Sequence, residues 1–182
     1  MSVDTQTLDQ AAVSAYLEQH LPGFAGLSEV TKFQGGQSNP TFLLTTPKDN
    51  YVLRRKPPGV LLKSAHAVDR EYRVQKALAG TDVPVAKMYL LCEDDDVIGS
   101  AFYIMEQVAG RNITDPAMPD FSTADRGAII DEMNRVLAAL HQVDIDAVGL
   151  SDYGPEGNYF ERQVGRWSKQ YRASETEKVP AM

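Results

Sequence analysis

The chain has 182 residues, of which 43% are hydrophobic and 24% are charged. This composition is typical of a soluble globular protein and excludes the disordered and fibrous classes. The 25 acidic residues outnumber the 18 basic ones, giving a net charge of -7, and the densest basic cluster is only Arg54-Arg55-Lys56. Because nucleic acids attract extended clusters of positive charge, we expect no nucleic-acid partner.

Compartment and membrane contact are predicted from cysteine and apolar patterning. Cys92 is the single cysteine, so no internal disulfide can form, which favours a reducing compartment. No apolar run approaches the length of a membrane-spanning helix. The sequence therefore predicts a cytoplasmic protein without a membrane partner.

The first predicted element is a helix that begins at Thr7. Thr7 and Gln10 have the spacing of a capping box, and apolar residues follow at helical spacing: Leu8, Ala12, Ala15 and Tyr16. Pro22-Gly23 ends this helix. We assign residues 1–28 to an N-terminal helix.

From residue 29 the pattern predicts β-strands. Two short strands are expected between Glu29 and Leu44, around Gly35-Gly36, and a third over residues 50–54, before Pro57-Pro58-Gly59. A helix is expected over residues 64–79, because Val68, Tyr72 and Leu78 share one face.

Two further strands are expected over residues 85–92 and 97–105, joined by the acidic turn 93–96. The predicted fold class is therefore α+β, with a five-stranded antiparallel sheet and one helix. Residues 29–110 make a small lobe and hinge.

Residues 111–182 are predicted to be helical after a linker rich in proline and aspartate. Ser122 and Asp125 cap one helix, and a last helix carries an apolar stripe: Phe160, Val164, Trp167 and Tyr171. We expect Trp167 to lie in the core. The alternatives are a docking face for a partner, a homo-oligomer or a missing C-terminal lobe that covers it.

Two charged residues occupy positions that normally face a core. Glu71 shares a helix face with Val68, Tyr72 and Leu78, and strand alternation puts Arg54 on the same face as Val52. An ion pair between Arg54 and Glu71 would satisfy both charges. The alternatives are that Glu71 is a boundary residue and that Arg54 is an exposed strand end.

The loop GGQSN, residues 35–39, also has two interpretations. Its glycines allow backbone N–H groups to line an anion site, with the Ser38 hydroxyl and the Asn39 amide as further donors. A simple hairpin turn is the alternative. It is not a P-loop, because no GxxxxGK[ST] occurs in the chain.

Four motifs in order resemble the small lobe of the aminoglycoside phosphotransferase family: GGQSNPTFLL, YVLRRKPPG, DREYRVQKAL and AFYIMEQVAG. The chain is most similar to the kinase-like branch related to the N-terminal domain of certain acyl-CoA dehydrogenase family members. The resemblance continues through LAALHQVDIDAVGL and NYFERQVGRWSKQY. It implies a protein-kinase-like small lobe followed by the first helices of an incomplete large lobe.

The resemblance assigns nucleotide-binding roles by position. The loop would cover the phosphates through Gly35, Gly36, Gln37, Ser38 and Asn39. Arg54 would stand where kinases usually place a phosphate-binding lysine, and Glu71 would hold it. Met105 would guard the back of the adenine pocket, and the Glu106 carbonyl and Val108 amide would bind the adenine edge.

The family's HGD-type catalytic motif does not occur in this chain. The three histidines, His20, His66 and His141, are followed by Leu, Ala and Gln. We therefore expect ATP as cofactor, with Mg²⁺ whose ligands are absent here, and no catalytic or metal-binding residue in this chain. The function predicted is the nucleotide-binding portion of an ATP-dependent phosphotransferase acting on an unknown small-molecule hydroxyl. A non-catalytic module that docks through the Trp167 helix is the alternative, and a fragment without function is a third.

Overall fold

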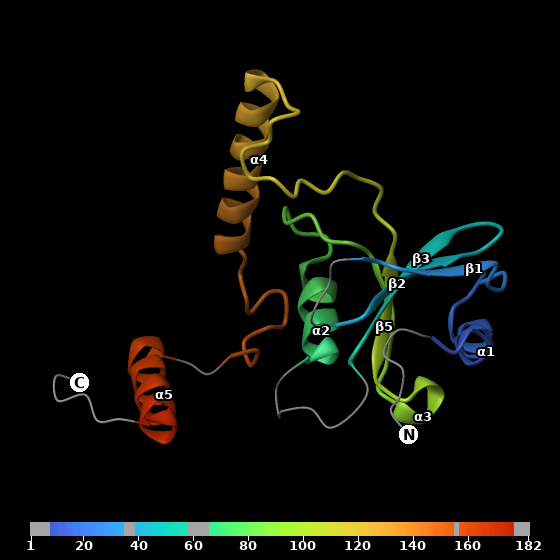
Figure 1. The fold of residues 1–182 in the computed structure, drawn as a ribbon, viewed down its shortest axis with the longest axis horizontal. Helices are drawn as coiled ribbons and strands as arrows, with labels where there is room; N and C mark the ends of the chain where they lie inside the picture. The colour runs from blue at the N-terminus through green and yellow to red at the C-terminus, as the bar shows by residue number, and fades with distance from the viewer. Residues whose placement is uncertain (1–7, 35–38, 58–65, 155–156, 177–182) are drawn as a thin grey trace.

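The computed structural model of the chain describes residues 8–34, 39–57, 66–154 and 157–176. At its centre is an antiparallel sheet of five strands in the order β1-β2-β3-β5-β4 (Figure 1). The strands are β1 (Glu29–Lys32), β2 (Thr41–Thr45), β3 (Asn50–Arg55), β4 (Met88–Cys92) and β5 (Phe102–Glu106). The α+β class and the five-stranded antiparallel sheet predicted from sequence are confirmed.

Two helices pack on opposite faces of this sheet, α1 (Gln10–His20) and α2 (Val68–Leu78). The other helices are α3 (Asp95–Ile98), α4 (Thr123–His141) and α5 (Tyr159–Ser174). Figure 1 shows α1 on one side of the sheet and α2 on the other. Within the described ranges, no helix has both the length and the apolar composition that crossing a membrane would require.

The alternation of β3 decides which residues meet which helix. Tyr51 and Leu53 join the core under α1, where Leu17 and Phe42 are also buried. Burying a large apolar side chain stabilises a fold by about 1.5–3 kcal/mol, so this cluster holds α1 in place. Arg54 lies on the opposite face, the side covered by α2.

Four boundaries differ from those predicted. Helix α2 begins at Val68, since residues 66–67 are not helical, and the predicted start at Ser64 lies outside the described residues. Helix α1 is capped by Asp9, which accepts the Ala12 N–H at 3.0 Å, and Thr7 lies outside the described residues. Strand β4 begins at Met88 rather than Val85. The acidic turn continues into the one-turn helix α3, because Asp94 accepts the Asp96 N–H at 2.9 Å; β5 therefore begins at Phe102 rather than residue 97.

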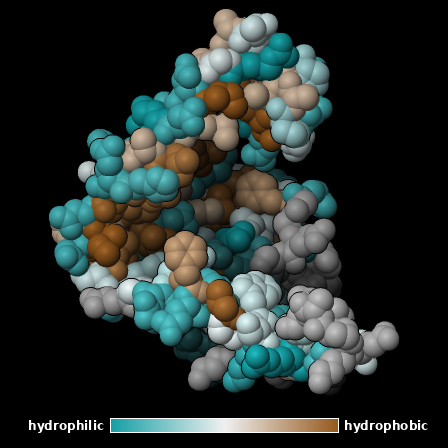
Figure 2. All heavy atoms as spheres, turned by 90° about the vertical axis from the view of Figure 1, so that its left-hand side faces the viewer, coloured by the Kyte–Doolittle hydropathy of each residue, from teal (hydrophilic) through white to brown (hydrophobic). Residues whose placement is uncertain are grey.

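The helical half carries exposed apolar side chains. The predicted cap of α4 is confirmed, since Ser122 Oγ accepts the Asp125 N–H at 3.1 Å. Trp167 on α5 is 56% exposed and Phe160 is 82% exposed, so the expectation that Trp167 lies in the core is wrong. Figure 2 shows apolar atoms gathered around a hollow on the side where α4 and α5 lie. Along α4, apolar residues line a groove of about 770 Å³: Ile129, Met133, Val136, Leu137 and Leu140.

Candidate functional site

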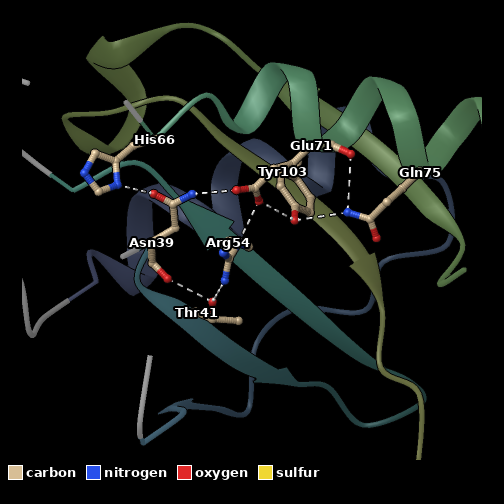
Figure 3. A network of polar contacts seen from close by, with 7 residues as sticks. All are labelled: Asn39, Thr41, Arg54, His66, Glu71, Gln75 and Tyr103. Carbon is tan, nitrogen blue, oxygen red and sulfur yellow. Dashed lines mark hydrogen bonds and ion pairs between the residues drawn. The ribbon is translucent and has the colours of Figure 1, made fainter. Parts of the chain in front are cut away.

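A network of polar contacts lies between α2 and the sheet, and Glu71 is at its centre (Figure 3). Nε of Arg54 lies 2.8 Å from Oε2 of Glu71. The predicted pair is therefore present. Arg54 lies within β3 rather than at an exposed strand end, whereas Glu71 is both paired and a boundary residue. Both side chains are about one-third exposed, so the pair sits at the edge of the core, within reach of solvent.

Two more donors fix the Glu71 carboxylate. Nδ2 of Asn39 donates to Oε1 at 2.9 Å, and the hydroxyl of Tyr103 donates to Oε2 at 3.1 Å. Gln75 supports Tyr103, because its Nε2 donates to the Tyr103 hydroxyl at 3.4 Å. A partly buried carboxylate with an arginine and two neutral donors has the partners that its desolvation demands. The Glu71 side chain is thereby held in one orientation.

Tyr103 is buried on β5 directly opposite Arg54 in the sheet register. Burial, and after it the negative charge of Glu71, raises the pKa of Tyr103 to about 12. Its hydroxyl therefore stays protonated at neutral pH and remains a donor to Glu71.

Asn39 connects Glu71 to His66. Because the carboxylate can only accept, the Asn39 amide must turn its NH₂ toward Glu71, which leaves Oδ1 facing Nδ1 of His66 at 2.9 Å. His66 therefore donates from Nδ1. Asn39 is only 2% exposed, and its side chain is engaged inside the protein; contact of this amide with a phosphate remains a prediction.

Arg54 keeps one edge of its guanidinium open. Nε is paired with Glu71, and Nη1 donates to Oγ1 of Thr41 at 3.0 Å. Among the residues that the structure describes, none accepts a hydrogen bond from Nη2. A guanidinium oriented on two sides and open on the third can bind an anionic oxygen.

The predicted adenine residues lie at the other end of β5. Met105 is half-buried, and it shares the α2 side of the sheet with Tyr103. Glu106 is exposed at the strand end, where its N–H donates to the Lys87 carbonyl at 2.9 Å. Val108 is 65% exposed. Met105 packs against the cluster that contains Tyr103, while Glu106 and Val108 lie beyond it at the end of the strand.

Gly35, Gly36, Gln37 and Ser38 lie outside the described residues. The structure thus brings together three of the predicted residues, Asn39, Arg54 and Glu71.

Four members of the network were not predicted: Thr41, His66, Gln75 and Tyr103. Gln75 follows Glu71 by one helical turn, and Tyr103 is expected to face α2 once β5 is paired with β3. The sequence gives no such signal for His66, which has a φ of 60°. No cluster of metal-binding side chains occurs in the described ranges.

The profile of the phosphotransferase enzyme family matches residues 29–182. Acyl-CoA dehydrogenase family member 11 of Mus musculus is 48% identical over 178 residues, which cover 96% of this chain and 23% of that protein. Family member 10 of the same organism is 45% identical, with 98% of this chain and 17% of that protein covered. The chain therefore spans less than a quarter of the length of these relatives.

Two solved structures have the same fold. A candidate aminoglycoside phosphotransferase from Ralstonia eutropha JMP134 is 58% identical and superposes with a TM-score of 0.80, over 96% of this chain and 50% of that one. A thermostable mutant of aminoglycoside phosphotransferase APH(4)-Ia, solved with AMP-PNP and hygromycin B, is 18% identical with a TM-score of 0.51, over 74% of this chain and 40% of that one. The second likeness concerns the fold alone. The kinase-like fold predicted from the motifs is confirmed.

Proposed function

The chain belongs to the phosphotransferase enzyme family, and we propose that it is the nucleotide-binding portion of an ATP-dependent phosphotransferase that acts on a hydroxyl group of a small molecule. The observation that carries this proposal is the orientation of Arg54. Glu71 and Thr41 hold two edges of its guanidinium, and Nη2 makes no hydrogen bond with the described residues. A fixed cation with an open donor is suited to a phosphate oxygen.

Bound ATP would supply the γ-phosphoryl group that the family transfers. Arg54 donates from Nη2 to a phosphate oxygen, while Glu71 keeps the guanidinium plane in place and lowers the conformational entropy lost on binding. Gly35, Gly36, Gln37 and Ser38 are proposed to cover the phosphates, together with Asn39. These roles concern binding, and each acts before any chemical step.

The adenine ring is proposed to lie beside the end of β5. Met105 forms the back wall, and the Glu106 carbonyl and Val108 N–H bind the adenine edge. The exposure of Val108 supports this, since its backbone lies in an accessible segment. The proposed division of the chain is an N-terminal helix (residues 1–28), a small lobe with the hinge (29–110) and the start of the helical lobe (111–182). We propose a cytoplasmic location.

Transfer itself is not assigned to residues of this chain. None of His20, His66 and His141 is followed by Gly-Asp, so the sequence offers no aspartate base of the HGD type. Mg²⁺ is proposed to accompany ATP, with ligands that this chain does not supply. The acceptor is proposed only as a class, a small-molecule hydroxyl. The nucleotide and hygromycin B in the APH(4)-Ia structure support that class by analogy.

A second candidate function is supported by α5. Phe160 is 82% exposed and Trp167 is 56% exposed, which is unusual for large apolar residues on one helix face. A docking module would use this face to bind a partner, a second copy of the chain or a C-terminal lobe. Trp167→Glu is expected to abolish such an association in sedimentation velocity, and to leave nucleotide binding unchanged.

Calorimetric titration with ATP tests the main proposal. The wild-type chain is expected to bind, and Arg54→Ala to lose about tenfold or more in affinity, because a charge-assisted hydrogen bond is removed. Lys56→Ala is the matched control: it removes a positive charge two residues away, outside the network, and is expected to change affinity by less than about twofold. Equal affinities of wild type and Arg54→Ala would contradict the proposal.

A further inference from the structure

The outward side of α2 is bound to a segment far along the chain, residues 149–153. Arg73 donates to both carboxylate oxygens of Asp152, at 3.2 Å from Nη1 to Oδ2 and by a shorter contact from Nη2 to Oδ1. Nη2 also donates to the Gly149 carbonyl at 3.1 Å. These residues are 76 to 79 positions apart in the sequence, so the contact joins separate parts of the fold.

Arg70 makes a second attachment one turn earlier. Its Nη2 donates to the Tyr153 carbonyl at 2.7 Å, and its guanidinium lies 4.1 Å from the centre of the Tyr153 ring. The Tyr153 hydroxyl returns a hydrogen bond to the Arg70 carbonyl at 3.4 Å. We call the four residues Arg70, Arg73, Asp152 and Tyr153 the α2 clasp.

The segment that holds Asp152 is itself ordered by local contacts. Leu150 is buried, and its N–H donates to the Ile145 carbonyl at 2.7 Å. Ser151 Oγ donates to Asp146 Oδ1 at 2.6 Å. Gly149 has a φ of 72°, a conformation that glycine adopts without strain. Asp152 and Tyr153 are therefore presented to α2 from a fixed turn.

The clasp and the nucleotide site lie on different sides of α2. With about 100° of rotation per residue, Arg70 is displaced by about 100° from Glu71, and Arg73 by about 160°. Glu71 faces the sheet, while the two arginines face residues 149–153. A small rotation of α2 would move both sets of contacts together.

We propose that the α2 clasp sets the rotation of α2 and thereby holds Glu71 on Arg54. This proposal rests on the proposed function, and it makes Arg70, Arg73, Asp152 and Tyr153 positioning residues of the nucleotide site. Arg54 is on β3 and Glu71 is on α2, so the geometry of their ion pair depends on where α2 lies. The clasp fixes that position from a second side, through residues 149–153.

The charges of the clasp support each other. The Arg73 hydrogen bond lowers the pKa of Asp152, with Arg70 adding a smaller effect in the same direction. The hydrogen bond that Arg73 donates to Asp152 also raises the pKa of Arg73. Exposed ion pairs usually contribute little, but this pair is bidentate and shares its arginine with a backbone carbonyl, which restricts its geometry.

Hydrogen exchange of the α2 amides tests the clasp, together with ATP affinity. Asp152→Asn removes the charge with almost no change in size, and we expect α2 amides to exchange about threefold or more faster, with ATP binding weakened about threefold. The charge swap Arg73→Asp with Asp152→Arg is expected to recover part of the protection of the α2 amides and part of the ATP affinity. Glu132→Gln is the control, since it breaks an ion pair of similar exposure between neighbouring turns of α4 and leaves α2 untouched.

A double variant separates positioning from general stability. If the clasp acts through Glu71, Glu71→Ala with Asp152→Asn binds ATP no more weakly than Glu71→Ala alone. Additive losses would overturn the proposal, and so would unchanged α2 exchange in Asp152→Asn. If the wild-type chain binds no ATP, the proposed function fails, but the exchange measurement still decides whether the clasp holds α2.

Discussion

Nε of Arg54 lies 2.8 Å from Oε2 of Glu71 and joins the central strand β3 to helix α2. Asn39, Thr41 and Tyr103 complete the set of hydrogen bonds around this pair. The consequence is a cation with a defined direction at the edge of the sheet.

Asn39→Ala is expected to destabilise the fold by about 1–3 kcal/mol, because it removes a buried bridge and leaves Glu71 and His66 each without one partner. Asn39→Asp is expected to cost more, since it places a second carboxylate within hydrogen-bond distance of Glu71. The free energy of unfolding in urea measures both. Equal stability of the Asp and Ala variants would contradict the geometry assigned to Asn39.

Met105→Trp is expected to block adenine entry by filling the space next to β5, with ATP affinity lowered about tenfold or more. Met105→Leu is the control, because it keeps the volume and the apolar character. Circular dichroism establishes that both variants retain the fold. Wild-type ATP affinity in a folded Met105→Trp variant would show that adenine does not lie beside this residue.

Tyr103 predicts a dependence of stability on pH. A folded-state pKa of about 12, raised from 10.0 mainly by burial, means that the protonated phenol is favoured in the folded chain. The contribution of the protonated phenol to the free energy of unfolding is complete below pH 10 and is lost as pH rises toward 12. Each pKa unit corresponds to about 1.4 kcal/mol. In urea unfolding at several pH values, Tyr103→Phe should flatten this decline. An equally steep decline in Tyr103→Phe would exclude Tyr103 as its source.

The lowered pKa of Asp152 predicts that the clasp weakens at low pH, a dependence opposite in direction to that of Tyr103. The pKa of Asp152 is lowered chiefly by the hydrogen bond from Arg73, so the contribution of the clasp is present above the ordinary aspartate pKa and is lost as pH falls through the folded value. Exchange of α2 amides, corrected for the intrinsic pH effect, should accelerate over that range in wild type. In Asp152→Asn, exchange is expected to be fast at every pH. A wild-type chain without this acceleration would contradict the assignment.

Local patterns predicted the sheet, the helix α2 and the Arg54–Glu71 pair, because strand alternation and helical spacing determine which side chains face inward. Helix α3 as a whole was missed, since an acidic run favours both a turn and a helix cap. The hydrogen bond between His66 and Asn39 and the contacts of the clasp join segments that are far apart in the sequence. The exposure of Trp167 likewise depends on which distant segments pack against α5. Local periodicity does not indicate such contacts, so they could be identified only from the three-dimensional structure.

The central claim is that Arg54 and Glu71 act together in binding a nucleotide. The most direct measurement is a double-mutant cycle by calorimetric titration with ATP, using Arg54→Ala, Glu71→Ala and the double variant. The account predicts that each single variant loses about tenfold or more in affinity, and that the double variant is no weaker than either. Two independent losses that add in the double variant would contradict it.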